Sequence, residues 1–181
     1  VFCIMLHHGE KIYKKYLSDP YLRIFTGGTF IVILTLVVKC QDYNGAGMPI
    51  IERCFENEYV PYAFLLKMLF TAVTLGCGFK GGEIVPSFVV GGTFGCLFGN
   101  LIGFAPALCT AAGMGAVFCG VTNCPITSLL ICFELFGYDG MPYFLLSIAL
   151  SYMLSGYYGL YRSQKIVYSK YKTEYINRRT H

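Results

Sequence analysis

The amino-acid sequence predicts an all-α membrane protein whose helices are short, tilted and broken. Hydrophobic residues make up 55% of its 181 positions, only 13% carry a charge, and the mean hydropathy is +0.56. A soluble domain needs more charged residues to cover its water-facing surface. In addition, several apolar segments are shorter than a bilayer is thick and are separated by Gly, Pro and Asn. This pattern is typical of the interrupted helices of transporters and channels.

Charged residues are concentrated at the two ends of the chain. Between Ile84 and Tyr161 the only ionisable acids are Glu134 and Asp139, and this stretch contains no Lys or Arg. Basic residues that flank spanning segments stay in the cytoplasm, so we expect a multi-pass cell-membrane protein with both ends cytoplasmic. The net charge of +4 comes without a basic stripe interleaved with base-stacking aromatics, so no nucleic-acid partner is expected.

Neither the cysteines nor the histidines predict a metal or cofactor site. The nine cysteines form no CxxC pair and are expected to pack as small apolar side chains in a reducing compartment. His7 and His8 are interpreted as solvated. The sequence has no HExxH, nucleophile elbow or Walker loop, which argues against an enzyme.

Three parts are expected along the chain. Residues 1–21 hold the end of an upstream helix and a basic cytoplasmic connector, with a polar break at 7–11. Residues 22–161 hold the membrane helices, and residues 162–181 hold a last helix and a basic cytoplasmic tail. The last helix is expected over residues 164–179.

The middle part is expected to contain seven helices. The first crosses the membrane over residues 23–38, and a polar turn at 41–47 follows it. A short amphipathic helix and a helix begun by Pro61 come next, and then a long helix that Pro86 opens. The seven expected helices occupy residues 23–38, 48–57, 61–75, 86–104, 107–121, 126–136 and 142–154.

The helix after Pro86 carries glycines at four-residue intervals. Gly91, Gly95, Gly99 and Gly103 form consecutive GxxxG steps, which lay a smooth ridge along one helix face. Such a ridge lets another helix backbone approach closely in lipid. We therefore expect this helix to be buried among other helices.

The segment Gly-Gly-Glu-Ile-Val-Pro at residues 81–86 is the main candidate for an anion site. The first backbone N–H groups of a helix lack intrahelical acceptors, and the helix dipole places about half a positive charge there. The two glycines let the backbone approach an ion. An ordinary bend before a proline-started helix is the alternative. The expected anion-binding residues are Gly82, Glu83, Ile84 and Val85.

Four motifs in order resemble the CLC family of chloride channels and anion/proton antiporters. Residues 79–88 resemble the second filter segment of this family, a Gly-Gly-x-Phe/Ile-x-Pro helix start. Residues 112–116 resemble its Ala-Gly-Met-Gly-Ala motif, and residues 123–127 resemble its x-x-Pro-Leu-Thr motif. Residues 165–168 resemble its Lys-Pro-Leu-Tyr motif, which implies that the hydroxyl of Tyr168 coordinates the central anion.

The resemblance implies that this chain is the C-terminal, inverted-repeat half of a homodimeric halide transporter in the lipid bilayer. The first-half filter segments and their gating glutamate are absent from the sequence. We therefore expect the chain alone to transport nothing. A truncated, non-transporting membrane scaffold is the alternative from another class.

Glu83 bears on the choice of ion. Most chloride-type members have an apolar residue here, whereas the branch that exchanges fluoride for protons resembles Gly-Gly-Glu-x-Thr-Pro, and Val85 replaces its Thr. A carboxylate beside an anion must be protonated, point away or exchange with the ion. Glu83 is therefore a candidate for proton or ion coupling, or it caps its own helix. We expect fluoride/proton antiport, with a chloride channel or chloride/proton antiporter as alternatives, and interpret Glu134 as structural.

Overall fold

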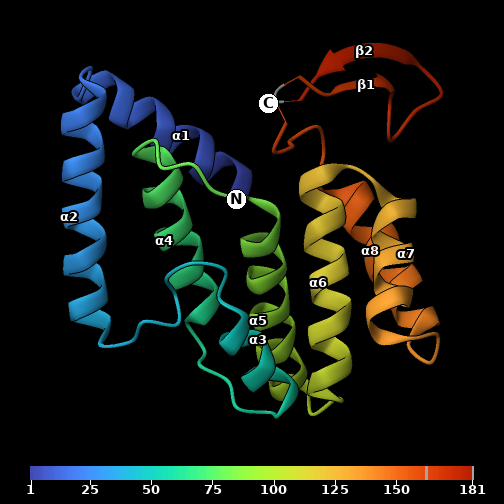
Figure 1. Ribbon diagram of the computed structural model, residues 1–181. Coiled ribbons are helices and arrows are strands. Elements are labelled where there is room, and N and C mark those ends of the chain that lie inside the picture. The colour runs from blue at the N-terminus through green and yellow to red at the C-terminus, as the bar shows by residue number, and fades with distance from the viewer. Residues whose placement is uncertain (162, 181) are drawn as a thin grey trace.

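The structure is a computed structural model that describes residues 1–161 and 163–180. The described residues form eight α-helices and one two-stranded antiparallel sheet (Figure 1). The helices are α1 (Phe2–Tyr16), α2 (Pro20–Val38), α3 (Met48–Phe55), α4 (Ala63–Gly76), α5 (Ile84–Ile102), α6 (Pro106–Thr122), α7 (Pro125–Phe136) and α8 (Met141–Leu154). The strands are β1 (Lys165–Tyr168) and β2 (Tyr175–Arg179).

The helices form a bundle with α5 and α6 at its centre (Figure 1). Helices α4 and α1 pack on one side of this pair, and α7 and α8 pack on the other. Helix α2 stands at the outer edge against α4, and Gly27 is its only buried residue. Ile31, Leu34 and Val38 pack against a core cluster, and most of its other apolar side chains are exposed, which suits a helix with one face toward lipid.

The helix lengths agree with the predicted broken pattern. Among the described residues, α2 and α5 are long and apolar enough to cross a membrane, with 19 residues each. Four other apolar helices, α4, α6, α7 and α8, have 12 to 17 residues. A bilayer requires about 20 apolar residues in a helix that crosses it upright. The short helices therefore depend on their neighbours to cover their ends.

Prolines and left-handed residues set most helix limits. Asp19 caps α2 by accepting a hydrogen bond from the Tyr21 amide at 2.9 Å, so the helix begins at Pro20. Asn123 ends α6 in the left-handed conformation, with φ of 57°. Gly103 ends α5 in the same way, with φ of 69°, and is not part of the packing ridge.

The predicted polar break at residues 7–11 is wrong, because α1 runs unbroken from Phe2 to Tyr16. Gly9 is tolerated inside it because α4 passes closely there: a Cβ at this position would lie 3.2 Å from the Ala72 carbonyl oxygen. The Glu10 carboxylate accepts a hydrogen bond from the Lys14 ammonium at 2.6 Å, one turn later, which supports the helix.

The predicted helix over residues 164–179 is also wrong, because β1 and β2 form a hairpin there. The structure is thus mostly helical rather than all-α. Alternating β-branched and aromatic residues, such as Ile166 and Tyr168, favour a strand. Lys170 in the connecting loop donates hydrogen bonds to the Tyr152 carbonyl at 3.0 Å and the Ser155 hydroxyl at 2.9 Å. These bonds attach the hairpin to the end of α8.

Candidate anion site at the start of α5

Helix α5 begins at Ile84, two residues before Pro86, so the proline lies within the first turn. There its missing N–H leaves no hydrogen bond unmade. Glu83 holds the N-cap position, but its side chain makes no capping hydrogen bond to its own helix. The Ser87 hydroxyl is buried and donates to the Ile84 carbonyl at 2.6 Å. Because the Glu83 side chain makes no capping hydrogen bond, the alternative that Glu83 caps its own helix is wrong.

The backbone before α5 is open to approach. Gly81 and Gly82 are exposed, and a Cβ on Gly82 would meet nothing within 4 Å. Ile84 and Val85 are 37% and 39% exposed. Their amides belong to the group of first-turn donors that a helix does not use internally. The four residues predicted to bind the anion thus form one continuous, accessible segment, with Glu83 half-buried in its middle.

A cavity of about 630 Å³ lies on one side of this segment. Its walls are the start of α5, the loop between α2 and α3, and one face of α4. Its lining includes Gly82, Val85, Tyr43, Gly45 and Lys67.

Lys67 of α4 also lines this cavity, and it was not among the residues predicted to bind the anion. It is 1% exposed, and among the described residues it is the largest fully buried side chain. Its ammonium donates hydrogen bonds to the carbonyl oxygens of Tyr43 at 3.1 Å and Gly45 at 2.7 Å. A single lysine inside an apolar membrane helix is itself a signal of function, and that signal was present in the sequence.

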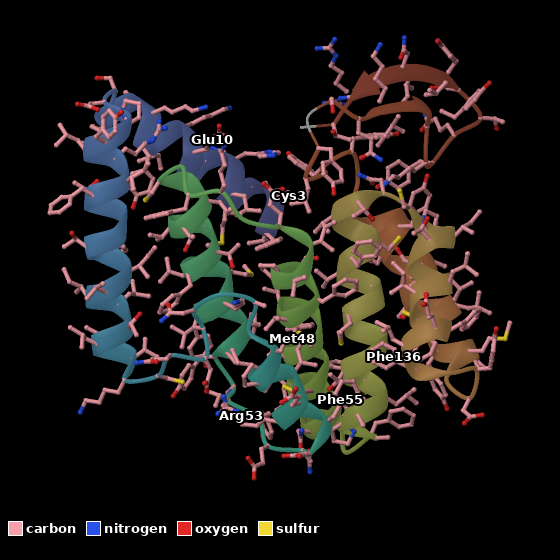
Figure 2. All side chains as sticks on the ribbon, in the orientation of Figure 1. Cys3, Glu10, Met48, Arg53, Phe55 and Phe136 are labelled. Atoms are coloured by element: carbon pink, nitrogen blue, oxygen red, sulfur yellow. The ribbon has the colours of Figure 1, made fainter. Side chains whose placement is uncertain are left out.

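A second cavity of about 310 Å³ lies against α1. Its lining includes Glu83, Glu10, His7 and Lys80, which gives it four ionisable groups. Glu83 and Val85 thus line different cavities, although only one residue separates them in sequence. The α1 residue Glu10 lies at the opposite end of the bundle from the α3 residues Arg53 and Phe55 (Figure 2).

Tyr168 does not lie at this segment. It is on β1, is 68% exposed, and packs edge-on against Tyr175 of β2 with the ring centroids 5.9 Å apart. It is not among the residues that line either cavity. Its predicted role in anion coordination stays a prediction.

The glycine ridge holds α5 against α6. A Cβ on Gly95 would overlap the Cys109 carbonyl oxygen, and one on Gly91 would overlap the Gly113 carbonyl oxygen. A Cβ on Gly99 would approach Pro106 Cα to 3.0 Å. Because the two backbones are this close, the start of α5 is attached to a rigid helix pair.

Glu134 and the nine cysteines are not among the residues that line the two cavities. Glu134 is exposed on α7. All nine cysteines lie in the described part of the chain and are free, and six of them are buried. Within residues 1–161 and 163–180, no group of three or more His, Cys, Asp or Glu side chains could hold a metal ion.

Comparison with known proteins places these features in a family. The family model described as "Voltage gated chloride channel" matches residues 1–156. The chain is 32% identical over 177 residues to a chloride/fluoride channel protein of Pseudomonas syringae pv. tomato, covering 94% of this chain and 39% of that protein. It is 28% identical over 143 residues to the H(+)/Cl(-) exchange transporter ClcA of Vibrio vulnificus, covering 73% of this chain and 29% of that protein.

A solved structure shows the same arrangement of helices. The crystal structure of a CLC-type fluoride/proton antiporter superposes with a TM-score of 0.85 at 30% sequence identity, covering 88% of this chain and 41% of that one. The chain spans less than half the length of each of these three proteins. The family resemblance predicted from the ordered motifs is confirmed. The chain belongs to the CLC family of voltage-gated chloride channels, a family of anion transporters and channels rather than enzymes.

Proposed function

We propose that this chain supplies the C-terminal, inverted-repeat half of a CLC-type pathway that exchanges fluoride for protons. The observation that carries the proposal is the start of α5, where an accessible run of backbone amides lies between two cavities. An anion inside a membrane has lost its hydration shell and needs positive potential from the protein. The backbone dipoles at a helix N-terminus supply that potential. The amides of Glu83, Ile84 and Val85 are the proposed donors.

Glu83 is the proposed coupling residue. It lines the smaller cavity together with Glu10 and His7, so a proton bound there has other titratable groups nearby. Glu83 lines the smaller cavity and is not among the residues that line the larger one, so it is proposed not to compete directly with an anion there. The names of two similar proteins, a chloride/fluoride channel and a fluoride/proton antiporter, support fluoride as the ion.

The whole protein is proposed to be a homodimer in the cell membrane, with Tyr168 completing the central anion site. Both terminal parts are proposed to be cytoplasmic. In support, α1 with its basic residues Lys11, Lys14 and Lys15 lies at the same end of the bundle as the β1–β2 hairpin (Figure 1). Basic segments at one end of a helical bundle favour the cytoplasmic side.

Chloride/proton exchange is the second candidate. Val85 stands where the fluoride-type motif has Thr, and a chloride exchanger is among the similar proteins. The test is halide efflux from liposomes that contain the full-length protein, recorded with fluoride and chloride electrodes together with external pH. Fluoride-selective efflux with proton uptake supports the proposal. Equal rates for both ions would contradict fluoride specificity, and halide efflux without proton movement would contradict exchange.

A further inference from the structure

Lys67 carries a buried positive charge that the proposed filter does not account for. It lies midway along α4, and its side chain reaches the wall of the 630 Å³ cavity that Gly81 and Gly82 also line. Gly47, with φ of 85°, leaves room for it, because a Cβ there would lie 2.9 Å from the ammonium nitrogen. The chain thus makes space for a cation beside the start of α5.

The charge of Lys67 has only neutral partners in the described part of the chain. Its two acceptors are the backbone carbonyls of Tyr43 and Gly45, and no described carboxylate lies within 4.0 Å of it. Burying an ammonium group costs several kcal/mol unless an anion or a sufficient set of dipoles compensates it. An ammonium also has three protons, and the carbonyls take two of them. The uncompensated charge and the third proton of Lys67 therefore both call for one further acceptor, preferably an anion.

The acidic residue next to the two carbonyl acceptors in sequence has other partners. Asp42 precedes Tyr43, but its carboxylate is hydrogen-bonded by the Arg53 guanidinium and by the Cys40 thiol, the latter at 3.1 Å. Lys80, the other lysine of the cavity, is exposed. Lys67 is thus the one buried cation among the described residues that line this cavity.

We propose that the larger cavity is an anion vestibule, in which the third proton of Lys67 holds a halide ion before it enters or after it leaves the start of α5. This inference rests on the proposed function, because it assigns the counter-ion of Lys67 to the transported species. The two carbonyl bonds fix the direction of the ammonium, and the halide completes its coordination. Lys67 is a binding residue for the ion and also a positioning residue for the loop 43–45.

Three substitutions in the full-length protein separate these two roles. K67R keeps both the charge and the donors, K67Q keeps donors without charge, and K67M removes both. K67M is a second neutral variant, so the comparison survives if either one fails to fold. K11M removes an exposed lysine of α1 that lines neither cavity and is the matched control. The measurements are the halide concentration for half-maximal efflux from liposomes and the Kd for fluoride and chloride by calorimetry in detergent.

We expect K67Q to raise the half-saturating halide concentration and the Kd about tenfold or more, because a charge-assisted hydrogen bond to the ion is lost. K67R should stay near the wild-type values, and K11M should match the wild type. Wild-type values in K67Q would overturn the vestibule and show that Lys67 serves only the loop or pairs with an acid from another part of the protein.

The proposed function and the vestibule can fail separately. If the wild type transports halide and K67Q behaves like it, the vestibule fails alone. If the wild type moves no halide but binds it, the proposed function fails, and the Kd of K67Q decides the vestibule. If the wild type neither moves nor binds halide, both are overturned.

Discussion

The ammonium nitrogen of Lys67 lies 2.7 Å from the carbonyl oxygen of Gly45, and this contact joins α4 to a loop residue 22 positions earlier in the chain. The loop is also packed by Tyr43, whose ring stacks on Phe70 of α4 with centroids 5.8 Å apart. One wall of the larger cavity is therefore held in place by α4. Its shape depends on a polar contact and an aromatic contact together.

Replacing Glu83 by Gln removes a titratable group from the smaller cavity while keeping its size and hydrogen-bonding capacity. If Glu83 carries the coupled proton, proton uptake per fluoride ion should fall toward zero in the full-length protein, while fluoride efflux persists. The measurement is simultaneous fluoride and pH recording on liposomes. E134Q, an exposed change on α7, is the control and should leave the ratio unaltered. An unchanged ratio in E83Q would remove Glu83 from proton transfer.

Replacing Gly95 by Ala places a methyl group against the Cys109 carbonyl oxygen and forces α5 and α6 apart. Overpacking of this kind costs about 1–3 kcal/mol, so the melting temperature in detergent should fall. G28A on α2 is the matched control, because a Cβ there would meet only Phe79 Cζ at 3.6 Å, an ordinary contact. G28A should be neutral or stabilising by up to about 1 kcal/mol. A G95A protein as stable as the wild type would contradict the close helix contact.

Acid should weaken the contact between Asp42 and Arg53, which connects the loop between α2 and α3 to helix α3. The hydrogen bond from the Cys40 thiol, together with the Arg53 guanidinium, holds the pKa of Asp42 below its ordinary value. Because the folded pKa is lowered, this stabilisation is present above the unfolded pKa of about 4 and is lost as pH falls through the folded pKa.

The stability difference between wild type and D42N should therefore be under about 1 kcal/mol at neutral pH, since the pair is partly exposed, and should vanish in acid. Thermal unfolding of both proteins across the acid range measures it. E56Q, an exposed change just after α3, is the control, and a difference that grows as pH falls would refute the assignment.

The membrane helices could be predicted from the sequence because their limits are local. Pro106 and Pro125 begin helices, and Asn123 ends one, through backbone preferences that belong to single residues. The helix start after Gly81 and Gly82 was predicted for the same reason, since a glycine pair before an early proline is a local pattern. These predictions needed no knowledge of which helices touch.

The errors arose where tertiary contacts decide the outcome. Gly9 and its polar neighbours read as a break, but the approach of α4 makes a glycine suitable inside α1. The last segment forms a hairpin that Lys170 attaches to α8 and to the end of α6. Lys67 was visible as a lone charge, but its acceptors lie in a loop whose position no local pattern specifies.

The placement of Glu83 and Val85 on opposite sides of one helical turn has an evolutionary consequence. Val85 lines the compartment next to Lys67, and Glu83 lines the compartment next to His7, so substitutions at the two positions change different walls. Ion preference, through residue 85, and proton dependence, through residue 83, can then evolve independently of each other among related proteins.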